Sequence, residues 1–488
     1  MNATIAYEIF VPSYCDSNGD GIGDLDGIAS KLPYLYDLGV DLIWLSPIFS
    51  SPSYHKYDVA DYHAIDHRFG DMAGFERLIN KANTLGIKVI LDLVLNHTST
   101  QHPWFKNASS GQNSTFRDFY IWKTPAEIKT LNAEQRAETA DSQERNPWHL
   151  VQKNDTQKYY GMFWSGMPDL NLANEAVQEE VFKIAQFWLV KGVAGFRLDA
   201  AKHVFPPWEE EKTQPFWADF KAACQKLNSD VYIVGEVWTS AENVSPYYKS
   251  FTSNFNFELC DGIRDILRNG RDQHNLIERL IKAYQQFGSI NPHFIDASML
   301  GNHDMERIAT VANDVRDKLK MAAFLQFTLP GLPYMYYGDE LGMYGHKPDE
   351  RIREAFLWDT RWQDTGRCQW QKPKYNTDSK VSPLKLQMED EDSIWHFYKK
   401  IIAFKKSNAV LRDISNFTLE KTNYSSEELL SYFRIGKDHR LLVFQNISKN
   451  TKTIETVENI QEVLWLEKGH VNGQYIELEA FGSVIISD

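Results

Sequence analysis

Three stretches of the sequence each combine apolar, strand-like residues with one carboxylate near the carboxyl end. These are Asp199 in GFRLDAAKH (195–203), Glu236 in VYIVGEVW (231–238) and Asp304 in SMLGNHDMER (298–307). A charge at the end of a buried strand is unfavourable unless it lies at a polar site, so three in succession indicate a shared active site. Cleavage of an acetal, such as a glycosidic bond, requires one carboxylate as nucleophile and another as acid and base. The three carboxylates are therefore the candidate catalytic groups.

Basic residues accompany these carboxylates. Arg197 precedes Asp199 by two positions, so both side chains point to the same face of their strand. We expect the guanidinium to keep Asp199 ionised, with Asp92 supporting Arg197 from a neighbouring strand. Glu236 must instead keep its proton, which calls for a raised pKa in a drier environment. The alternative, a purely structural ion pair between Arg197 and Asp199, does not explain the other charged residues nearby.

The carboxylates need a scaffold that brings the ends of several strands together. Eight apolar, β-rich runs alternate with amphipathic stretches of helix length. The runs are IAYEIF (5–10), DLIWLS (41–46), KVILDLVLNH (88–97), VAGFRLDA (193–200), VYIVGEVW (231–238), FNFEL (255–259), FIDASMLGNHD (294–304) and PYMYYGDE (333–340). Nearly continuous hydrophobicity is typical of parallel strands covered on both faces. The pattern predicts an α/β fold, a (β/α)8 TIM barrel with catalytic residues at the carboxyl ends of its strands. A doubly wound sheet is the alternative, but it would not gather these strand ends around one point.

Two segments depart from this alternation. The stretch 98–173 separates the third and fourth strands and is long enough to form an insert domain. From 408 to 488, short alternating strands predict a C-terminal antiparallel β domain. The predicted barrel therefore comprises residues 1–97 and 174–407.

Composition excludes several classes of protein. The net charge of −14 over 488 residues argues against a nucleic-acid-binding surface. No apolar run approaches the roughly 20 residues that span a bilayer, so no membrane association is predicted. The four cysteines show neither zinc-site spacing nor a disulfide framework. Because strand-like sequence begins at Ile5, we expect a cytoplasmic protein if Met1 is the native start, and otherwise a secreted or periplasmic one with its signal peptide removed.

Five motifs, in order along the chain, resemble the signatures of the α-amylase family (glycoside hydrolase family 13). They are DLVLNH (92–97), MPDLN (167–171), GFRLDAAKH (195–203), GEVW (235–238) and LGNHD (300–304). The resemblance covers essentially the whole chain. MPDLN is similar to the form found in a group intermediate between oligo-1,6-glucosidases and neopullulanases.

The resemblance implies a role for each site residue. Asp199 would be the nucleophile, Glu236 the acid/base, and Asp304 the group that holds the hydroxyls of the distorted sugar. The remaining substrate-binding residues implied are Tyr57 as a stacking platform, His97, Arg197 and His303 around the cleaved subsite, and Lys202 and His203 on the leaving-group side. The implied partner is an oligo- or polysaccharide.

A glycine-rich loop near the N-terminus carries oxygen side chains at alternate positions. In DSNGDGIGD (16–24) these are Asp16, Asn18, Asp20 and Asp24. Such hard oxygens select Ca²⁺ or Mg²⁺. The loop resembles the calcium loop of oligo-1,6-glucosidase-like family members, where the carbonyl at Ile22 also binds, which implies a structural calcium ion. A metal-free Asp/Asn/Gly turn is the alternative. A second calcium site of many α-amylases uses an aspartate where this chain has Asn171, so that site is not expected here.

Three local features bear on specificity. Ala200 follows Asp199 where relatives that cut α-1,6 bonds tend to carry valine, and Tyr54 stands where exo-acting glucosidases typically have aspartate. Together with Lys202 and His203, these features favour α-1,4 cleavage in an open cleft, as in an α-amylase. An α-glucosidase or a 4-α-glucanotransferase acting on malto-oligosaccharides is the alternative. A non-enzymatic, transporter-associated relative would lack catalytic carboxylates and carry a membrane span, neither of which fits.

Overall fold

The computed structural model describes residues 3–131, 144 and 146–487, and its centre is a closed barrel of eight parallel strands. In chain order these are β1 (Ala6–Ile9), β2 (Leu42–Leu45), β5 (Lys88–Leu93), β9 (Gly195–Leu198), β10 (Tyr232–Gly235), β11 (Ser253–Phe255), β12 (Ile295–Met299) and β13 (Leu332–Tyr336). Each strand pairs with its neighbours in chain order, and β1 closes the ring against β13. The predicted fold class is confirmed.

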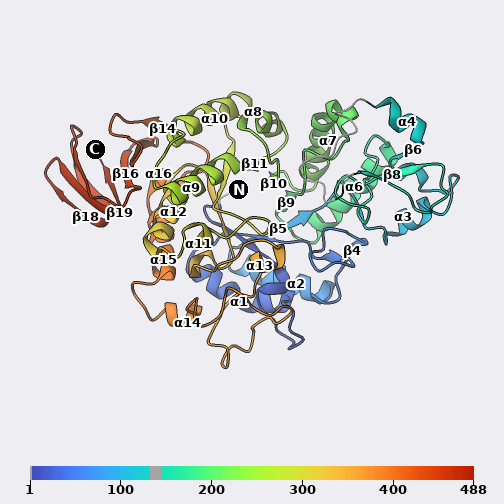
Figure 1. Ribbon diagram of the computed structural model, residues 1–488, viewed down its shortest axis with the longest axis horizontal. Helices are drawn as coiled ribbons and strands as arrows, with labels where there is room; N and C mark the ends of the chain where they lie inside the picture. The colour runs from blue at the N-terminus through green and yellow to red at the C-terminus, as the bar shows by residue number, and fades with distance from the viewer. Residues whose placement is uncertain (1–2, 132–143, 145, 488) are drawn as a thin grey trace.

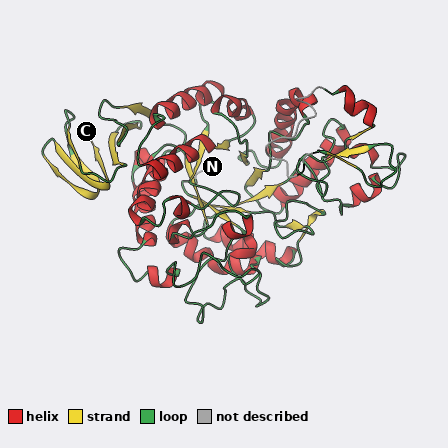
Figure 2. Cartoon of the chain, in the orientation of Figure 1, coloured by secondary structure: helices red, strands yellow, loops and turns green. Residues whose placement is uncertain are grey.

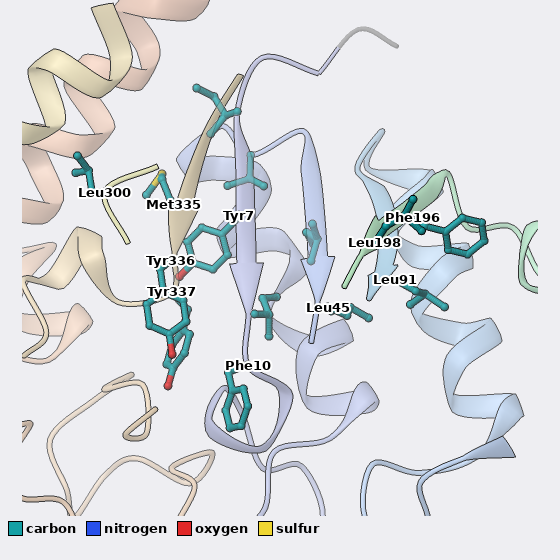
Figure 3. Close-up of a cluster of buried hydrophobic side chains, with 14 of the residues drawn as sticks. Tyr7, Phe10, Leu45, Leu91, Phe196, Leu198, Leu300, Met335, Tyr336 and Tyr337 are labelled. Atoms are coloured by element: carbon teal, nitrogen blue, oxygen red, sulfur yellow. The ribbon is translucent and has the colours of Figure 1, made fainter. Parts of the chain in front are cut away.

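Strand residues alternate between two hydrophobic layers. Tyr7 and Leu45 belong to the larger buried cluster, which includes residues of the surrounding helices, and Figure 3 shows them beside side chains from neighbouring strands. Ala6 and Trp44 belong to a second cluster drawn mainly from the strands, which fills the barrel interior. Burial on both faces explains why the strands read as continuous apolar runs.

Helices surround the barrel (Figure 1). The longer ones are α1 (Leu25–Leu38), α2 (Met72–Thr84), α6 (Glu175–Val190), α7 (Thr213–Gln225), α9 (Phe257–Asn269), α10 (Leu276–Ile290), α12 (Arg316–Thr328) and α15 (Ile394–Ser407). Short helices are α8 (Ala241–Val244), α11 (Ile308–Val311), α13 (Asp349–Ile352), α14 (Leu384–Gln387) and α16 (Ala409–Arg412). Asp24, Asp71 and Asn174 cap the first turns of α1, α2 and α6 through their side-chain oxygens.

The sixth strand lies earlier than the sequence pattern predicts. The run 255–259 was expected to be strand, but β11 ends at Phe255 and α9 begins at Phe257. Asn256 separates the two elements, because its side-chain oxygen accepts the backbone N–H of Leu259 at 2.8 Å as a helix N-cap. The apolar residues after it therefore belong to the buried face of a helix.

The segment between β5 and β9 forms a small unit beside the barrel, at the right of Figure 1. It contains α3 (Pro103–Ala108), α4 (Pro125–Thr130) and a three-stranded sheet of β6 (Trp122–Lys123), β8 (Lys158–Tyr160) and β7 (Trp148–His149). It is joined to the barrel end by an isolated bridge between His97 and Asp169 and by the Leu170 N–H, which donates to the Asn96 carbonyl at 2.9 Å. The insert is thus tied to the loop that follows β5.

The chain ends in an antiparallel sheet, seen as yellow strands at the left of Figure 2. Its strands are β14 (Thr418–Lys421), β15 (Leu429–Ile435), β16 (Arg440–Asn446), β17 (Lys452–Glu455), β18 (Glu462–Asn472) and β19 (Tyr475–Ser487). In chain order, α15 and the short α16 precede this sheet. Trp465 packs against Phe324 of α12 and Phe404 of α15. Among the described residues, no helix is long and apolar enough to cross a membrane.

Candidate active site

A cavity of about 370 Å³ opens at the carboxyl ends of the barrel strands. Seven of the nine residues predicted to be catalytic or to bind substrate line it: Tyr57, His97, Asp199, Lys202, His203, Glu236 and Asp304. The other two, Arg197 and His303, are buried in contact with these residues. The structure therefore brings together side chains from four different strand ends.

Arg197 organises the carboxylates of the cavity floor. Its Nη1 lies 2.6 Å from Asp199 Oδ1 and 2.8 Å from Asp92 Oδ1, and its Nη2 lies 2.8 Å from Glu236 Oε2. Glu236 Oε2 also accepts the backbone N–H of Ala200 at 3.0 Å. One guanidinium thus holds the two proposed reacting carboxylates side by side through its two amino groups.

Three carboxylates share this single guanidinium, and the pKa values of Asp199 and Asp92 are raised. Burial raises the pKa of Asp199 to about 8, with Arg197 opposing the rise and Glu236 adding to it. Burial likewise raises the pKa of Asp92 to about 6 against the effect of Arg197. The prediction that Arg197 simply keeps Asp199 ionised is therefore incomplete, because burial outweighs the effect of a guanidinium that also contacts Asp92 and Glu236. The group as a whole retains a proton near neutral pH.

Asp304 lies in the opposite electrostatic setting. Burial alone would raise its pKa, but the imidazolium of His303 and the guanidinium of Arg353 hold that pKa well below its usual range. His303 Nε2 lies 3.0 Å from Asp304 Oδ2, and Arg353 Nη2 lies 2.7 Å from Oδ1. Although burial lowers the pKa of His303, Asp304 and Glu8 raise it to about 10. Asp304 is therefore an ionised carboxylate beside two cations.

His303 and His97 both have protein partners on each ring nitrogen. His303 Nδ1 donates to Glu8 Oε1 at 2.6 Å, and its Nε2 lies 2.6 Å from the Tyr57 hydroxyl. Burial lowers the pKa of His97 to about 4. Because the Asn96 amide nitrogen donates to its Nδ1, the Nε2 of this neutral ring carries the proton and donates to the Tyr57 carbonyl at 3.2 Å. A sugar hydroxyl would have to share or replace that bond.

Tyr57 connects the two halves of the site. Its ring stacks on that of His303 with centroids 5.5 Å apart and an interplanar angle of 10°, and its hydroxyl donates to Asp92 Oδ2 at 2.9 Å. The ring therefore has a fixed orientation in the cavity wall. Lys202 also lines the cavity, and its Nζ donates to the Trp238 carbonyl at 2.9 Å. Ala200 has a φ of 46°, an unfavourable conformation for a residue with a Cβ, directly after Asp199.

Some cavity residues were not found by reading the sequence. Arg353 and Asp349, from the long loop after β13, and His55, beside Tyr57, line the cavity, as does Phe163 from the insert. No motif marks these positions. Glu8 could have been found from the sequence, because it is a carboxylate inside the apolar run 5–10. A charge in a buried strand is unfavourable unless it lies at a polar site, which is the argument already used for the three catalytic candidates.

The predicted metal loop wraps around its own carboxylates. Asp16 accepts backbone N–H groups from Asn18, Gly19 and Gly21, and Asp20 Oδ1 accepts that of Ile22 at 2.8 Å. The described residues contain no cluster of three or more His, Cys, Asp or Glu side chains placed to hold a metal ion. Oxygen lone pairs remain on the side chains of Asp16, Asn18 and Asp20, so this donor set suits a hard cation.

Asp24 and Asn171 are engaged differently from the other loop and motif oxygens. Asp24 Oδ1 accepts the Gly27 N–H at 2.6 Å and the Ser17 hydroxyl at 2.7 Å, so it serves as the N-cap of α1. Asn171 Nδ2 donates to the Asp118 carbonyl at 3.0 Å. An amide in this role provides a hydrogen bond where an aspartate would provide a metal ligand.

Comparisons with known proteins agree with this geometry. The model of the α-amylase catalytic domain matches residues 8–413. Alpha-amylase 3 of Dictyoglomus thermophilum is 40% identical over 99% of this chain and 92% of its own, and a 4-alpha-glucanotransferase of Thermotoga neapolitana is 33% identical over 93% and 98%. The crystal structure of an α-amylase from H. orenii superimposes with a TM-score of 0.90 at 36% identity over the whole of both chains. The resemblance seen in the motifs is thus confirmed, and the chain belongs to the α-amylase family of glycoside hydrolases.

Proposed function

We propose that this enzyme is a retaining hydrolase of α-1,4-glucosidic bonds in starch-type glucans and malto-oligosaccharides, of the α-amylase type. The observation that carries the proposal is the placement of Asp199 and Glu236 on the two amino groups of Arg197, at the floor of one cavity with Asp304. Retaining enzymes need two carboxyl groups about 5–5.5 Å apart, so that one can attack the sugar while the other protonates the leaving oxygen.

In the first step, the Asp199 carboxylate attacks the anomeric carbon and the glycosidic C–O bond breaks. Glu236 gives its proton to the departing oxygen, leaving a glycosyl ester on Asp199. In the second step, the Glu236 carboxylate removes a proton from water, whose oxygen displaces Asp199 and restores the starting groups. The contacts of Arg197 with both Asp199 and Glu236 support this assignment, because one guanidinium then holds the attacking carboxylate and the proton donor beside each other.

Asp304 has a different part in this scheme. Its strongly lowered pKa makes it a permanent hydrogen-bond acceptor for two hydroxyls of the reacting sugar. Hydrogen bonds from charged groups that strengthen as the ring distorts stabilise the transition state rather than the bound substrate. Arg353 and His303 hold the carboxylate in position for that task.

We also infer an open cleft with internal attack. Tyr54 occupies the position where exo-acting relatives carry an aspartate, and its hydroxyl accepts a hydrogen bond from Arg353 Nη1 at 2.9 Å. It therefore presents no charged group to the non-reducing end of a chain. Phe163 and Met167 of the insert also line the cavity, and an insert that closed this side would produce exo action instead.

The test is a product time course on maltoheptaose, together with a maltoheptaose derivative blocked at its non-reducing end. We expect mixed oligosaccharides in the first minutes, cleavage of the blocked substrate, and products initially in the α-anomeric form. Glucose alone, with the blocked substrate intact, would establish an α-glucosidase. Products longer than the substrate, without a matching rise in reducing ends, would establish a 4-α-glucanotransferase, the alternative that one relative's name favours.

A structural calcium ion at loop 16–24 is the second part of the proposal. The side chains of Asp16, Asn18 and Asp20, the Ile22 carbonyl and Asp24 are the implied ligands, and the alternate spacing of hard oxygens supports them. Asp24 is the weakest member, because its carboxylate already accepts hydrogen bonds from the Gly27 N–H and from the hydroxyl and N–H of Ser17. The ion would fasten the loop after β1 and would take no part in bond cleavage.

A further inference from the structure

A second cavity, of about 520 Å³, lies in the long loop that follows β13. Its lining includes Glu354, Leu357, Arg361, Trp362, Gln369 and Lys372. Glu354 immediately follows Arg353, which lines the catalytic cavity, so one extended segment separates the two hollows. The second cavity has the volume of an ordinary ligand site, for which about 300–1,000 Å³ is typical.

Trp362 stands at this cavity with 92% of its surface exposed, more than any other large apolar side chain in the described part of the protein. The guanidinium of Arg361 lies 5.8 Å from the centroid of its ring. A flat aromatic face next to hydrogen-bond donors complements a pyranose ring, which has apolar C–H faces and hydroxyl edges. Packing within this chain does not explain why a large aromatic residue stands at this exposed position.

The polar groups of the cavity divide into fixed and available ones. Glu354 is fully buried and accepts the backbone N–H of Asn376 at 2.8 Å, while Arg367 pairs with Asp364 at 3.1 Å. In contrast, across the described ranges the side chains of Arg361 and Lys372 make no hydrogen bond or ion pair. The rigid part of the lining is therefore satisfied internally, and the available donors stand at the cavity beside Trp362.

The cavity wall is anchored to the rim of the catalytic site. The Gln369 N–H donates to the Gly21 carbonyl at 2.6 Å, which holds the wall against the loop after β1. The next residue, Trp370, stacks on Tyr54 with centroids 5.3 Å apart and an angle of 24°, and its Nε1 donates to Ser13 Oγ at 2.8 Å. A ligand in the second cavity would thus lie behind the wall to which Tyr54 belongs.

We propose that this cavity is a second glucan-binding site, separate from the catalytic one, with Trp362 as its stacking platform and Arg361 and Lys372 as hydroxyl-binding donors. The inference rests on the proposed action on α-glucans. The carboxylates that line the second cavity are already paired within the protein, so the site suits a neutral polyhydroxylated ligand. Binding at this second site would retain long glucan chains at the catalytic end of the barrel. A short oligosaccharide would gain nothing from it.

The experiment measures maltoheptaose binding by titration calorimetry to the full-length Asp199→Asn enzyme, which binds but does not cleave. We expect two classes of site. Adding Trp362→Ala should weaken one class roughly tenfold, which corresponds to about 1.4 kcal/mol. The matched control is Asp199→Asn with Tyr36→Ala, which removes an aromatic side chain that is 59% exposed on α1, away from the cavity. It should keep both classes.

Kinetics of the active enzyme provide the second readout. Trp362→Ala should raise KM for a long glucan about tenfold, with a change of less than about twofold for maltotriose, because lost remote binding affects long chains only. Identical isotherms for the Trp362→Ala and Tyr36→Ala variants, or equal changes for both substrates, would overturn the second site. Inorganic phosphate that binds the wild type and is lost in Arg361→Ala would overturn it in favour of an anion site. Failure of the proposed function would look different, since the maltoheptaose time course would then give glucose alone or products longer than the substrate, whatever the binding comparison of Trp362→Ala and Tyr36→Ala showed.

Discussion

The carboxylates around Arg197 and those of loop 16–24 are both gathered closely, but they are neutralised in different ways. Asp92, Asp199 and Glu236 all contact one guanidinium within a buried site. In loop 16–24, Asp16 is also buried, yet its partners are backbone N–H groups of its own loop. The first group shares one charged partner, Arg197 of β9, which lies between β5 and β10 in the barrel, and the second is held by local dipoles.

This difference separates chemistry from scaffolding. A set of carboxylates that outnumbers its cation retains a proton near neutral pH, which acid/base catalysis requires. Carboxylates bound by backbone N–H groups are stabilised as anions and keep free lone pairs, which suits a hard cation. The same residue type therefore serves two purposes because its partners differ.

The largest effect on activity is expected when either member of the reacting pair, Asp199 or Glu236, is substituted. Asp199→Asn and Glu236→Gln should each lower kcat by roughly 10³-fold or more, because both residues act on one intermediate and cannot replace each other. Steady-state kinetics on maltoheptaose measures the effect, and circular dichroism checks that the variants fold. Retention of more than about a tenth of kcat, a barrier change below about 1.4 kcal/mol, would refute the assignment.

An intermediate effect is expected at Glu8, which supports the charge on His303 from β1. Glu8→Gln should lower the pKa of His303 from about 10 by about one unit, which titration of its imidazole followed by NMR measures. Because the folded pKa of His303 lies above its unfolded value of about 6.5, the stability it contributes is complete below that pH and is lost as pH rises through 10. Denaturation of Glu8→Gln should therefore show a deficit of about 1–3 kcal/mol that is largest in acid and fades in alkali.

An unchanged pKa of His303 in Glu8→Gln would show that Glu8 does not support the charge on His303. The matched control is Glu340→Gln, another buried carboxylate of the barrel end, which hydrogen-bonds to Tyr7 and Tyr34 and lines neither cavity. It should reduce stability without moving the pKa of His303.

The smallest effect concerns loop 16–24. Removing calcium with a chelator should lower the melting temperature by a few degrees, about 1–2 kcal/mol by mass action, while kcat of the folded enzyme changes little. Asp20→Ala should abolish this calcium-dependent shift. Differential scanning calorimetry with and without calcium measures it, and identical melting curves for metal-loaded and chelated protein would exclude the site.

The sequence by itself predicted the barrel, and it singled out Asp199, Glu236 and Asp304 as candidates, which the structure brings to one cavity. These features could be predicted because strand burial and strand-end charge are local properties of the chain. The start of α9 was missed, since Asn256 decides between strand and helix through a cap that hydrophobicity does not report.

Only the tertiary structure decided how the carboxylates are charged and what surrounds them. Glu8 reaches His303 across 295 residues of sequence, and Arg353 reaches Asp304 from the loop after the last barrel strand. The direction in which the pKa of Asp199 moves depends on burial and on three other charged groups, none of which its own motif specifies except Arg197. Electrostatic interaction depends on distance in space and on exclusion of water, and neither quantity is encoded at a single position of the chain.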